Sequence, residues 1–155
     1  MSAKDKLIAL VGVTAASGAL YLTTASEGTV LKVYKDPVGI LTSCMGHTGP
    51  ELKLGQTFTL EQCQEQQYAD LLKHAAALDC VKTPLTDGEK AAYLSFAYNV
   101  GVSNFCKSTL VKLKNDGRSM AACDQLLRWV MPGTNLEKGL RTRRNLERSY
   151  CVRNL

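Results

Sequence analysis

The segment Glu27–Gly49 reads EGTVLKVYKDPVGILTSCMGHTG and holds the most informative arrangement of polar residues in the chain. Two carboxylates, Glu27 and Asp36, lie nine residues apart, and the hydroxyl of Thr42 follows six residues after the second. Turn-forming residues lie between and after them: Pro37, Gly39, Gly46 and Gly49. The pattern predicts the end of a helix followed by two or three short strands, which would bring these polar side chains into one region.

Two carboxylates held near each other suit general acid–base catalysis at a glycosidic bond. One carboxyl protonates the leaving oxygen, and the other activates water or stabilises the cationic transition state. The acid needs a raised pKa to hold its proton near neutral pH, while the second carboxylate stays ionised. A threonine hydroxyl adds a group that both donates to and accepts from a water. The spacing alone is equally compatible with two acids on a solvated face.

The whole string E-G-(x)5-Y-K-D-(x)2-G-(x)2-T-(x)3-G-H-T resembles the active-site segment of phage-type lysozymes, the endolysins of glycoside hydrolase family 24. The matched positions are Glu27, Gly28, Tyr34, Lys35, Asp36, Gly39, Thr42, Gly46, His47 and Thr48. The resemblance implies that Glu27 is the general acid and that Asp36 and Thr42 position or activate the hydrolytic water. It implies hydrolysis of β-1,4 bonds between N-acetylmuramic acid and N-acetylglucosamine in peptidoglycan, with inversion and with no metal or cofactor.

The resemblance extends over roughly residues 27–151 and carries an expectation about the fold. It implies an α+β, mostly α, lysozyme-like fold of two lobes. A small β-hairpin or sheet lobe would carry Asp36 and Thr42, and a larger helical lobe would form the other wall of the cleft. We count three residues as substrate-binding candidates: His47, Asn99 and Arg144. For His47 we expect a hydrogen-bonded framework position near the acid rather than the role of base.

Residues 7–26, LIALVGVTAASGALYLTTAS, contain no charged side chain, and Lys4 and Lys6 precede them. A helix of twenty residues at about 1.5 Å per residue crosses the hydrocarbon core of a bilayer. The segment is only weakly apolar, since seven of the twenty residues are Gly, Ser or Thr and five are Ala. It therefore has the length of a membrane span without the composition of a strong anchor.

Three interpretations of this segment compete. It is a cleaved signal peptide with small residues at Thr23–Ala25, a permanent anchor or buried core helix, or a signal-anchor-release segment of the kind that many similar endolysins carry. We favour release, because cleavage at Ala25 would leave Glu27 almost at the new N-terminus. The expected division is residues 1–26 as the signal-anchor-release segment and residues 27–155 as the catalytic domain. The protein would sit at the periplasmic face of the host inner membrane, inactive, and then enter the periplasm as a monomer.

Six cysteines is a large and even number for a chain of 155 residues. No pair has CxxC spacing and neither histidine lies at metal-ligand spacing from two of them, which argues against a zinc site. Disulfides would place the domain outside a reducing cytosol, whereas six free thiols would suit a cytosolic protein. Fifteen full connectivities exist for six cysteines, and we expect pairing between neighbours: Cys44 with Cys63, Cys80 with Cys106, and Cys123 with Cys151.

The sequence from residue 59 onward predicts helices. Capping boxes at Thr59–Gln62 and Thr86–Glu89 open one helix that runs to about Leu78 and another that ends at Gly101. A further helix should be capped by Ser119. The last should begin near Asn135 and is rich in arginine, which indicates either a cleft wall for an acidic polymer or a solvated face with an Arg143–Glu147 pair.

Two functions of other classes are compatible with parts of the sequence. A non-catalytic peptidoglycan-binding module would need the acids of the 27–49 segment to be structural. A basic helical nucleic-acid binder would use the net charge of +5, which comes from 19 basic and 14 acidic residues. The cysteine content and the export segment count against nucleic acid as a partner, and the intact set of Glu27, Asp36 and Thr42 counts against a mere binding module.

Overall fold

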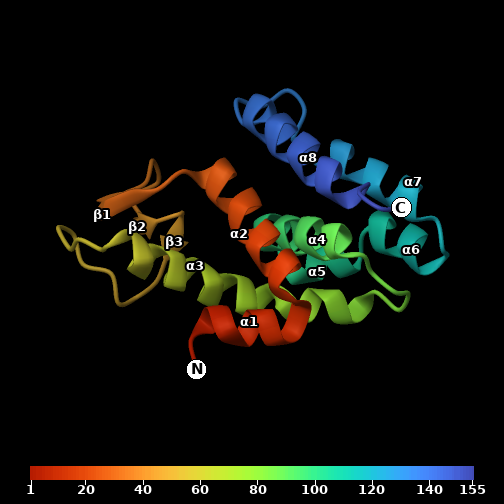
Figure 1. Cartoon of the computed structure of the whole chain (residues 1–155). Helices are drawn as coiled ribbons and strands as arrows, with labels where there is room; N and C mark the ends of the chain where they lie inside the picture. The colour runs from red at the N-terminus through yellow and green to blue at the C-terminus, as the bar shows by residue number, and fades with distance from the viewer.

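The computed structural model describes every residue of the chain except the side chains of Ser26 and Glu27. A small sheet lies at one end of the molecule and most of the helices lie at the other (Figure 1). Helices α2 (Val13–Glu27) and α3 (Leu60–His74) run between the two regions. This is the mostly helical, two-lobed lysozyme-like arrangement that the sequence predicted.

The first 27 residues form two helices, α1 (Ala3–Val11) and α2, that meet at Gly12. Gly12 adopts a φ of +92°, which a residue with a Cβ rarely adopts, so the chain turns there. Among the described residues, no single helix has the length and apolar character of a membrane span. Taken together, Ala3–Val11 and Val13–Ala25 have the length and composition of a membrane span, but the two helices are bent by 119° relative to each other.

The sheet has three antiparallel strands in the order β1 (Val30–Lys35), β2 (Leu41–Cys44) and β3 (His47–Thr48). Tyr34 pairs with Thr42, and Thr42 in turn pairs with Thr48. The turn between β1 and β2 includes Gly39 at a φ of +86°. The predicted sequence of a helix end, short strands and turns is confirmed.

The remaining elements pack around α4 (Asp87–Val100), whose central residues are buried. They are η1 (Ala75–Cys80), α5 (Val102–Cys106), α6 (Thr109–Asn115), α7 (Ser119–Gln125), η2 (Leu126–Arg128) and α8 (Glu137–Cys151). Both predicted capping boxes are confirmed, at Thr59 and at Thr86.

Three helix boundaries differ from the predicted ones. Helix α3 ends at His74, and a tighter 3₁₀ turn continues the chain to Cys80. Ser119 is the first residue of α7 and does not cap it, because Arg118 occupies the capping position. The last helix begins at Glu137, because a turn precedes it. In this turn the N–H of Glu137 donates to the carbonyl of Thr134, and the N–H of Gly133 donates to the Glu137 carboxylate.

The N-terminal helices contribute directly to the core. Leu7, Val11, Ala16 and Ala19 are buried in a cluster with side chains of α3 and α4. Helix α2 lies so close to α4 that a Cβ added at Gly18 would be 2.9 Å from the Cβ of Ala91. The apolar face of residues 7–22 is therefore covered by the rest of the protein in this structure.

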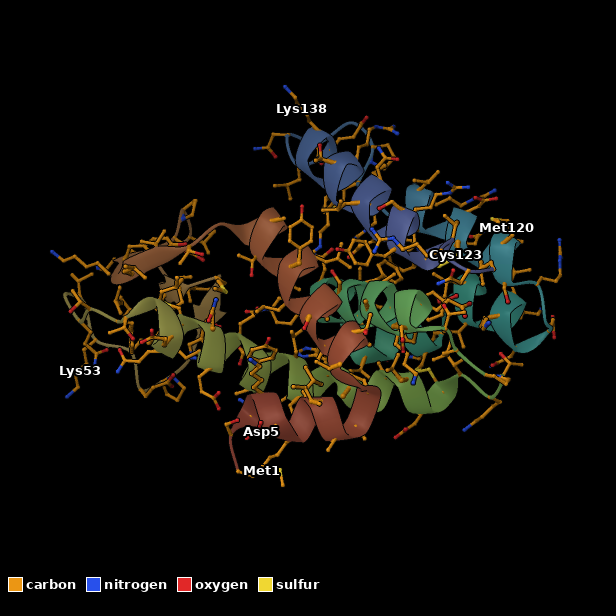
Figure 2. All side chains as sticks on the ribbon, viewed as in Figure 1. Met1, Asp5, Lys53, Met120, Cys123 and Lys138 are labelled. Carbon is orange, nitrogen blue, oxygen red and sulfur yellow. A yellow bond between two sulfur atoms is a disulfide. The ribbon has the colours of Figure 1, made fainter. Side chains whose placement is uncertain are left out.

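The three disulfides confirm the pairing between neighbouring cysteines. Cys44 at the end of β2 bonds to Cys63 of α3, with 5.0 Å between the Cα atoms. Cys80 of η1 bonds to Cys106 of α5. Cys123 of α7, labelled in Figure 2, bonds to Cys151 of α8. Each bond joins two elements of secondary structure, so each closes a loop of the tertiary fold.

Candidate active site

Helix α2 leads from the helical lobe into the sheet and ends at Glu27, the predicted acid. Gly28 follows with a φ of +70° and donates its N–H to the carbonyl of Thr24, which closes the last turn. The backbone thus agrees with the expectation that Glu27 ends the helix between the lobes. The Glu27 side chain, and with it the predicted position of the acid group, lies outside the described residues.

Asp36 and Thr42 meet at the backbone of one residue, Ile40, across the β1–β2 turn. The Oδ1 atom of Asp36 accepts the N–H groups of Val38 at 2.9 Å and Ile40 at 2.8 Å. The Oγ1 atom of Thr42 donates to the carbonyl of Ile40 at 3.0 Å, and the N–H of Asp36 donates to the same carbonyl. The turn therefore fixes the carboxylate and the hydroxyl relative to each other.

This arrangement leaves each group with capacity for a water. Within the described part of the chain, Oδ2 of Asp36 accepts no hydrogen bond. The Thr42 hydroxyl uses its proton on Ile40, and its lone pairs remain available to accept. Thr42 is buried and Asp36 is half-buried, so the sheet supplies a sheltered pair of oxygens beside the strand ends.

His47 joins the sheet to helix α3. Its Nδ1 lies 2.7 Å from a carboxylate oxygen of Asp70, and its Nε2 lies 2.7 Å from one of Glu51. Burial alone would lower the pKa of His47, but the hydrogen bonds and charges of Glu51 and Asp70 outweigh it and raise that pKa. The bond from His47 in turn lowers the pKa of Glu51. Both ring nitrogens are engaged, as the predicted framework position requires.

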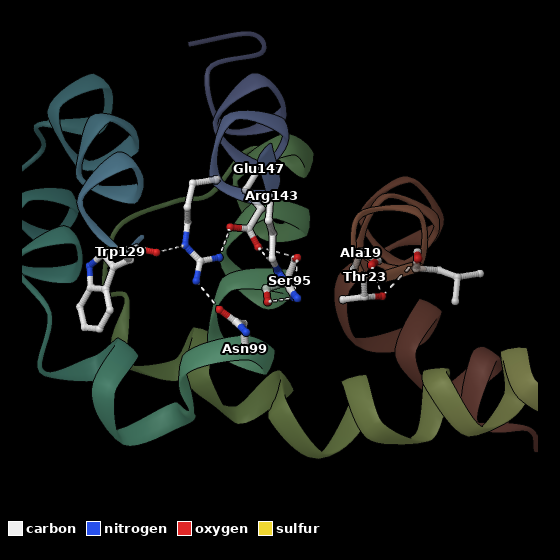
Figure 3. A network of polar contacts seen from close by, with 9 residues as sticks. Ala19, Thr23, Ser95, Asn99, Trp129, Arg143 and Glu147 are labelled. Carbon is white, nitrogen blue, oxygen red and sulfur yellow. Dashed lines mark hydrogen bonds and ion pairs between the residues drawn. The ribbon is translucent and has the colours of Figure 1, made fainter. Parts of the chain in front are cut away.

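Between α4 and α8 lies a buried network of charged side chains (Figure 3). The Glu147 carboxylate is fully buried and accepts from Arg143, Arg144 and the hydroxyl of Ser95. The expected Arg143–Glu147 pair is present at 3.3 Å, but the expectation of a solvated face was wrong. A pair on a solvated face and a pair in the core have the same sequence spacing. Here the packing of α8 on α4 buries the pair.

A cavity of about 740 Å³ lies beside this network, between the end of α4 and the start of α8. Its lining includes Asn99 of α4, Trp129 just after η2, and Arg144 of α8. Two of the predicted substrate-binding residues, Asn99 and Arg144, thus lie together and are hydrogen-bonded to each other. His47 lies apart from them in the sheet region, hydrogen-bonded to Asp70 and Glu51.

Several residues of these sites were not assigned a role from the sequence. Glu51 and Asp70 hold His47, and Ser95 completes the buried network. Asp70 lies 23 residues from His47, and Ser95 lies 52 residues from Glu147. No local pattern links such distant partners, so only the tertiary structure reveals them.

Comparison with known proteins places the chain in a family. The model of the phage lysozyme family matches residues 24–147. A SAR-endolysin of Bacteriophage PS119 is 42% identical over 127 residues, which is 81% of this chain and 76% of that protein. A SAR-endolysin of Enterobacteria phage PA-2 is 40% identical over 146 residues, or 94% of this chain and 86% of that one.

Solved structures agree with these sequence matches. An endolysin from the Escherichia coli O157:H7 phage FAHEc1 superposes with a TM-score of 0.80 at 27% identity, covering 89% of this chain and 92% of that one. A mutant of P22 lysozyme gives a TM-score of 0.77 at 32% identity, with 86% and 94% covered. From the family match, the sequence relatives and the shared fold, the chain belongs to the phage lysozyme family.

Proposed function

We propose that this lysozyme hydrolyses the β-1,4 bonds between N-acetylmuramic acid and N-acetylglucosamine in peptidoglycan and so lyses the host cell. Glu27 is the general acid that protonates the leaving oxygen. Asp36 and Thr42 hold and activate a water that attacks the anomeric carbon from the opposite face, which inverts its configuration. Asn99, Arg144 and His47 serve substrate binding, either by contact or by holding groups that make contact.

The single observation that carries this proposal is the joint anchoring of Asp36 and Thr42 on Ile40. A carboxylate and a hydroxyl fixed on the backbone of the same residue form a rigid binding site for one water, and rigid placement of reacting groups is a large part of enzymatic rate enhancement. The family match covers this region and supports the same assignment. A module that only binds peptidoglycan would not need such a water-binding site.

We further propose that residues 1–26 are a signal-anchor-release segment and that residues 27–155 are the catalytic domain. While residues 7–26 lie in the inner membrane, Glu27 is held at its periplasmic surface and the enzyme is inactive. When the membrane is depolarised, the weakly apolar segment leaves it, α1 and α2 pack against the body, and the monomeric enzyme acts from the periplasm. The SAR-endolysin relatives and the buried face of α1 and α2 support this proposal.

The experiment is the loss of turbidity of Gram-negative cells with permeabilised outer membranes. We expect wild type to lyse them and Glu27→Gln, which keeps the shape but cannot donate the same proton, to lose activity by about a thousandfold, within the range for general acid catalysis and charge stabilisation. Glu61→Gln is the matched control, because Glu61 is an exposed carboxylate of α3. It should lyse cells like wild type.

Two results would overturn the assignment. Full lysis by Glu27→Gln would show that the acid at the end of α2 is accidental. Wild type that binds cell walls without cleaving them would favour a peptidoglycan-binding module instead.

A further inference from the structure

One carboxylate, that of Glu147, lies between two buried arginines at the centre of the helical lobe. Its Oε1 accepts from Nη1 of Arg144 at 2.7 Å, and its Oε2 accepts from the Ser95 hydroxyl at 2.7 Å and from Nε of Arg143 at 3.3 Å (Figure 3). Glu147 is 0% exposed and Arg144 is 1% exposed. Charged side chains are rarely buried so completely unless their partners hold them.

Arg144 uses two further donors to join two parts of the cavity wall. Its Nε donates to the carbonyl of Trp129 at 2.9 Å, and its Nη2 donates to Oδ1 of Asn99. The guanidinium also lies 4.8 Å from the centre of the Phe96 ring. A guanidinium is planar and its donors have fixed directions. Its orientation, set by Glu147, therefore determines where Asn99 and the Trp129 backbone lie.

The partner of Asn99 decides which way its amide is turned. Arginine has only donors, so the amide must present its oxygen to Arg144 and keep its nitrogen on the other side. Asn99 is exposed and lines the cavity. Among the residues that the structure describes, Nδ2 of Asn99 donates to none. The amide nitrogen is thus the group that Asn99 offers to a ligand in the cavity.

Trp129 supplies an apolar surface to the same cavity. Its ring is half-buried and packs edge to face against Phe96, with 5.3 Å between the ring centres. An N-acetylated sugar presents an acetamido carbonyl oxygen, which accepts a hydrogen bond, and C–H groups and a methyl group, which pack on aromatic carbon. An amide donor beside an indole ring matches both features.

We propose that Glu147 is a positioning residue for the lysozyme reaction: it orients Arg144, which sets Asn99 and Trp129 to hold an N-acetylated sugar. This inference rests on the proposed function. Arg144 is part of the cavity wall but only 1% exposed, and it acts by holding Asn99, whose Nδ2 donates to the acetamido oxygen. Glu147 touches neither the sugar nor the reacting atoms.

The test is steady-state kinetics on soluble, uncrosslinked glycan strands with Glu147→Gln, Asn99→Ala and the double variant. Each single change should raise KM about threefold to tenfold, the range for the loss of one neutral hydrogen bond, and change kcat less than about twofold. The double variant should raise KM by less than the product of the two single effects, because Glu147 acts in part through Asn99. Effects of the two changes that multiply would overturn the proposal.

Asp124→Asn is the matched control, since Asp124 is an exposed carboxylate that binds another arginine of α8, Arg148, at 2.8 Å. Its KM should equal that of wild type, and an equal rise there would refute a specific role for Glu147. Asn99→Asp is the second variant in case Glu147→Gln does not fold. It keeps the oxygen for Arg144 and removes the donor, so it should raise KM as well, and an unchanged KM would overturn the proposal.

Dissociation constants of the same strands, measured by calorimetry in the Glu27→Gln background, separate this inference from the proposed function. They report binding without turnover and should rise by the same factors. Wild type that fails to cleave the strands would contradict the proposed function. Equal dissociation constants with and without Glu147→Gln would contradict the inference alone.

Discussion

Ile40 contributes only its backbone to the candidate site, yet its N–H and carbonyl hold both Asp36 and Thr42. The hydroxyl of Thr42 can therefore be removed without changing the strand pairing or leaving a cavity in the sheet. In Thr42→Val a methyl group replaces the hydroxyl of a buried residue, and the pairing of β2 with β1 and β3 is retained.

We expect Thr42→Val to lower kcat by about a hundredfold, because the water loses one of its two fixed partners. The free energy of unfolding should fall by only about 1 kcal/mol, since one hydrogen bond is lost. Lysis kinetics and urea unfolding measure the two effects. Thr57→Val, an exposed threonine elsewhere in the same lobe, should change neither. A Thr42→Val enzyme with wild-type kcat would remove Thr42 from the catalytic site.

His47 gives the β lobe a stability that depends on pH. Its pKa is raised in the folded protein, so protonated His47 stabilises the fold fully below its ordinary value of 6.5, and this contribution is lost as pH rises through the raised pKa. Glu51 acts in the opposite range: its lowered pKa gives stability above 4.5 that is lost at more acidic pH.

We therefore expect His47→Gln to lower the free energy of unfolding more at about pH 6 than at about pH 9. Urea unfolding of wild type and variant at both values measures the difference. If His47→Gln costs the same stability at the two pH values, the ion pairs with Glu51 and Asp70 do not stabilise the fold.

At the scale of the element, the proposed release mechanism places two different demands on α2. While it lies in the membrane it would need apolar character on every side, whereas in the folded protein it needs small residues where it approaches α4. Gly18 faces α4, and a Cβ there would lie 2.9 Å from Ala91 and 3.2 Å from the Tyr150 ring. Ser17, its neighbour in sequence, is exposed. The two positions lie about 100° apart around the same helix, so only one of them faces α4.

This contrast separates membrane affinity from packing. Gly18→Leu and Ser17→Leu each add similar apolar character to the segment, but only the first overpacks the interface with α4, at a cost of about 1–3 kcal/mol. We expect Gly18→Leu to retain more protein in the membrane fraction after depolarisation and to delay lysis more than Ser17→Leu. Equal retention of the two variants would show that packing on α4 does not drive release.

Local patterns in the sequence predicted the helices and their caps better than they predicted which side chains are buried. The capping boxes at Thr59 and Thr86 are confirmed, because each depends on residues three positions apart. The expected pairing of each cysteine with its neighbour in sequence is also confirmed. The burial of Arg143, Arg144 and Glu147 was not predicted. An arginine four residues before a glutamate has the same spacing on a surface as in a core, and only the packing of α8 on α4 distinguishes the two.

At the scale of the whole molecule, the two lobes divide the candidate site. The sheet presents Asp36 and Thr42, the helical lobe presents the cavity with Asn99 and Trp129, and α2 connects them (Figure 1). Motifs in the 27–49 segment predicted the first group. The second group combines residues of α4, α8 and the chain after η2, so its geometry depends on how these elements pack and could not be derived from spacing.

The most direct test of the account is the chemistry of the product released from purified peptidoglycan. Hydrolysis by the proposed mechanism leaves N-acetylmuramic acid at the new reducing end, initially as the α anomer, because a β bond is cleaved with inversion. Borohydride reduction and mass spectrometry identify the end sugar, and NMR during the first turnovers identifies the anomer. Muramitol with an initial α anomer is the predicted result. A reducing N-acetylglucosamine end, a 1,6-anhydro sugar or an initial β anomer would contradict it.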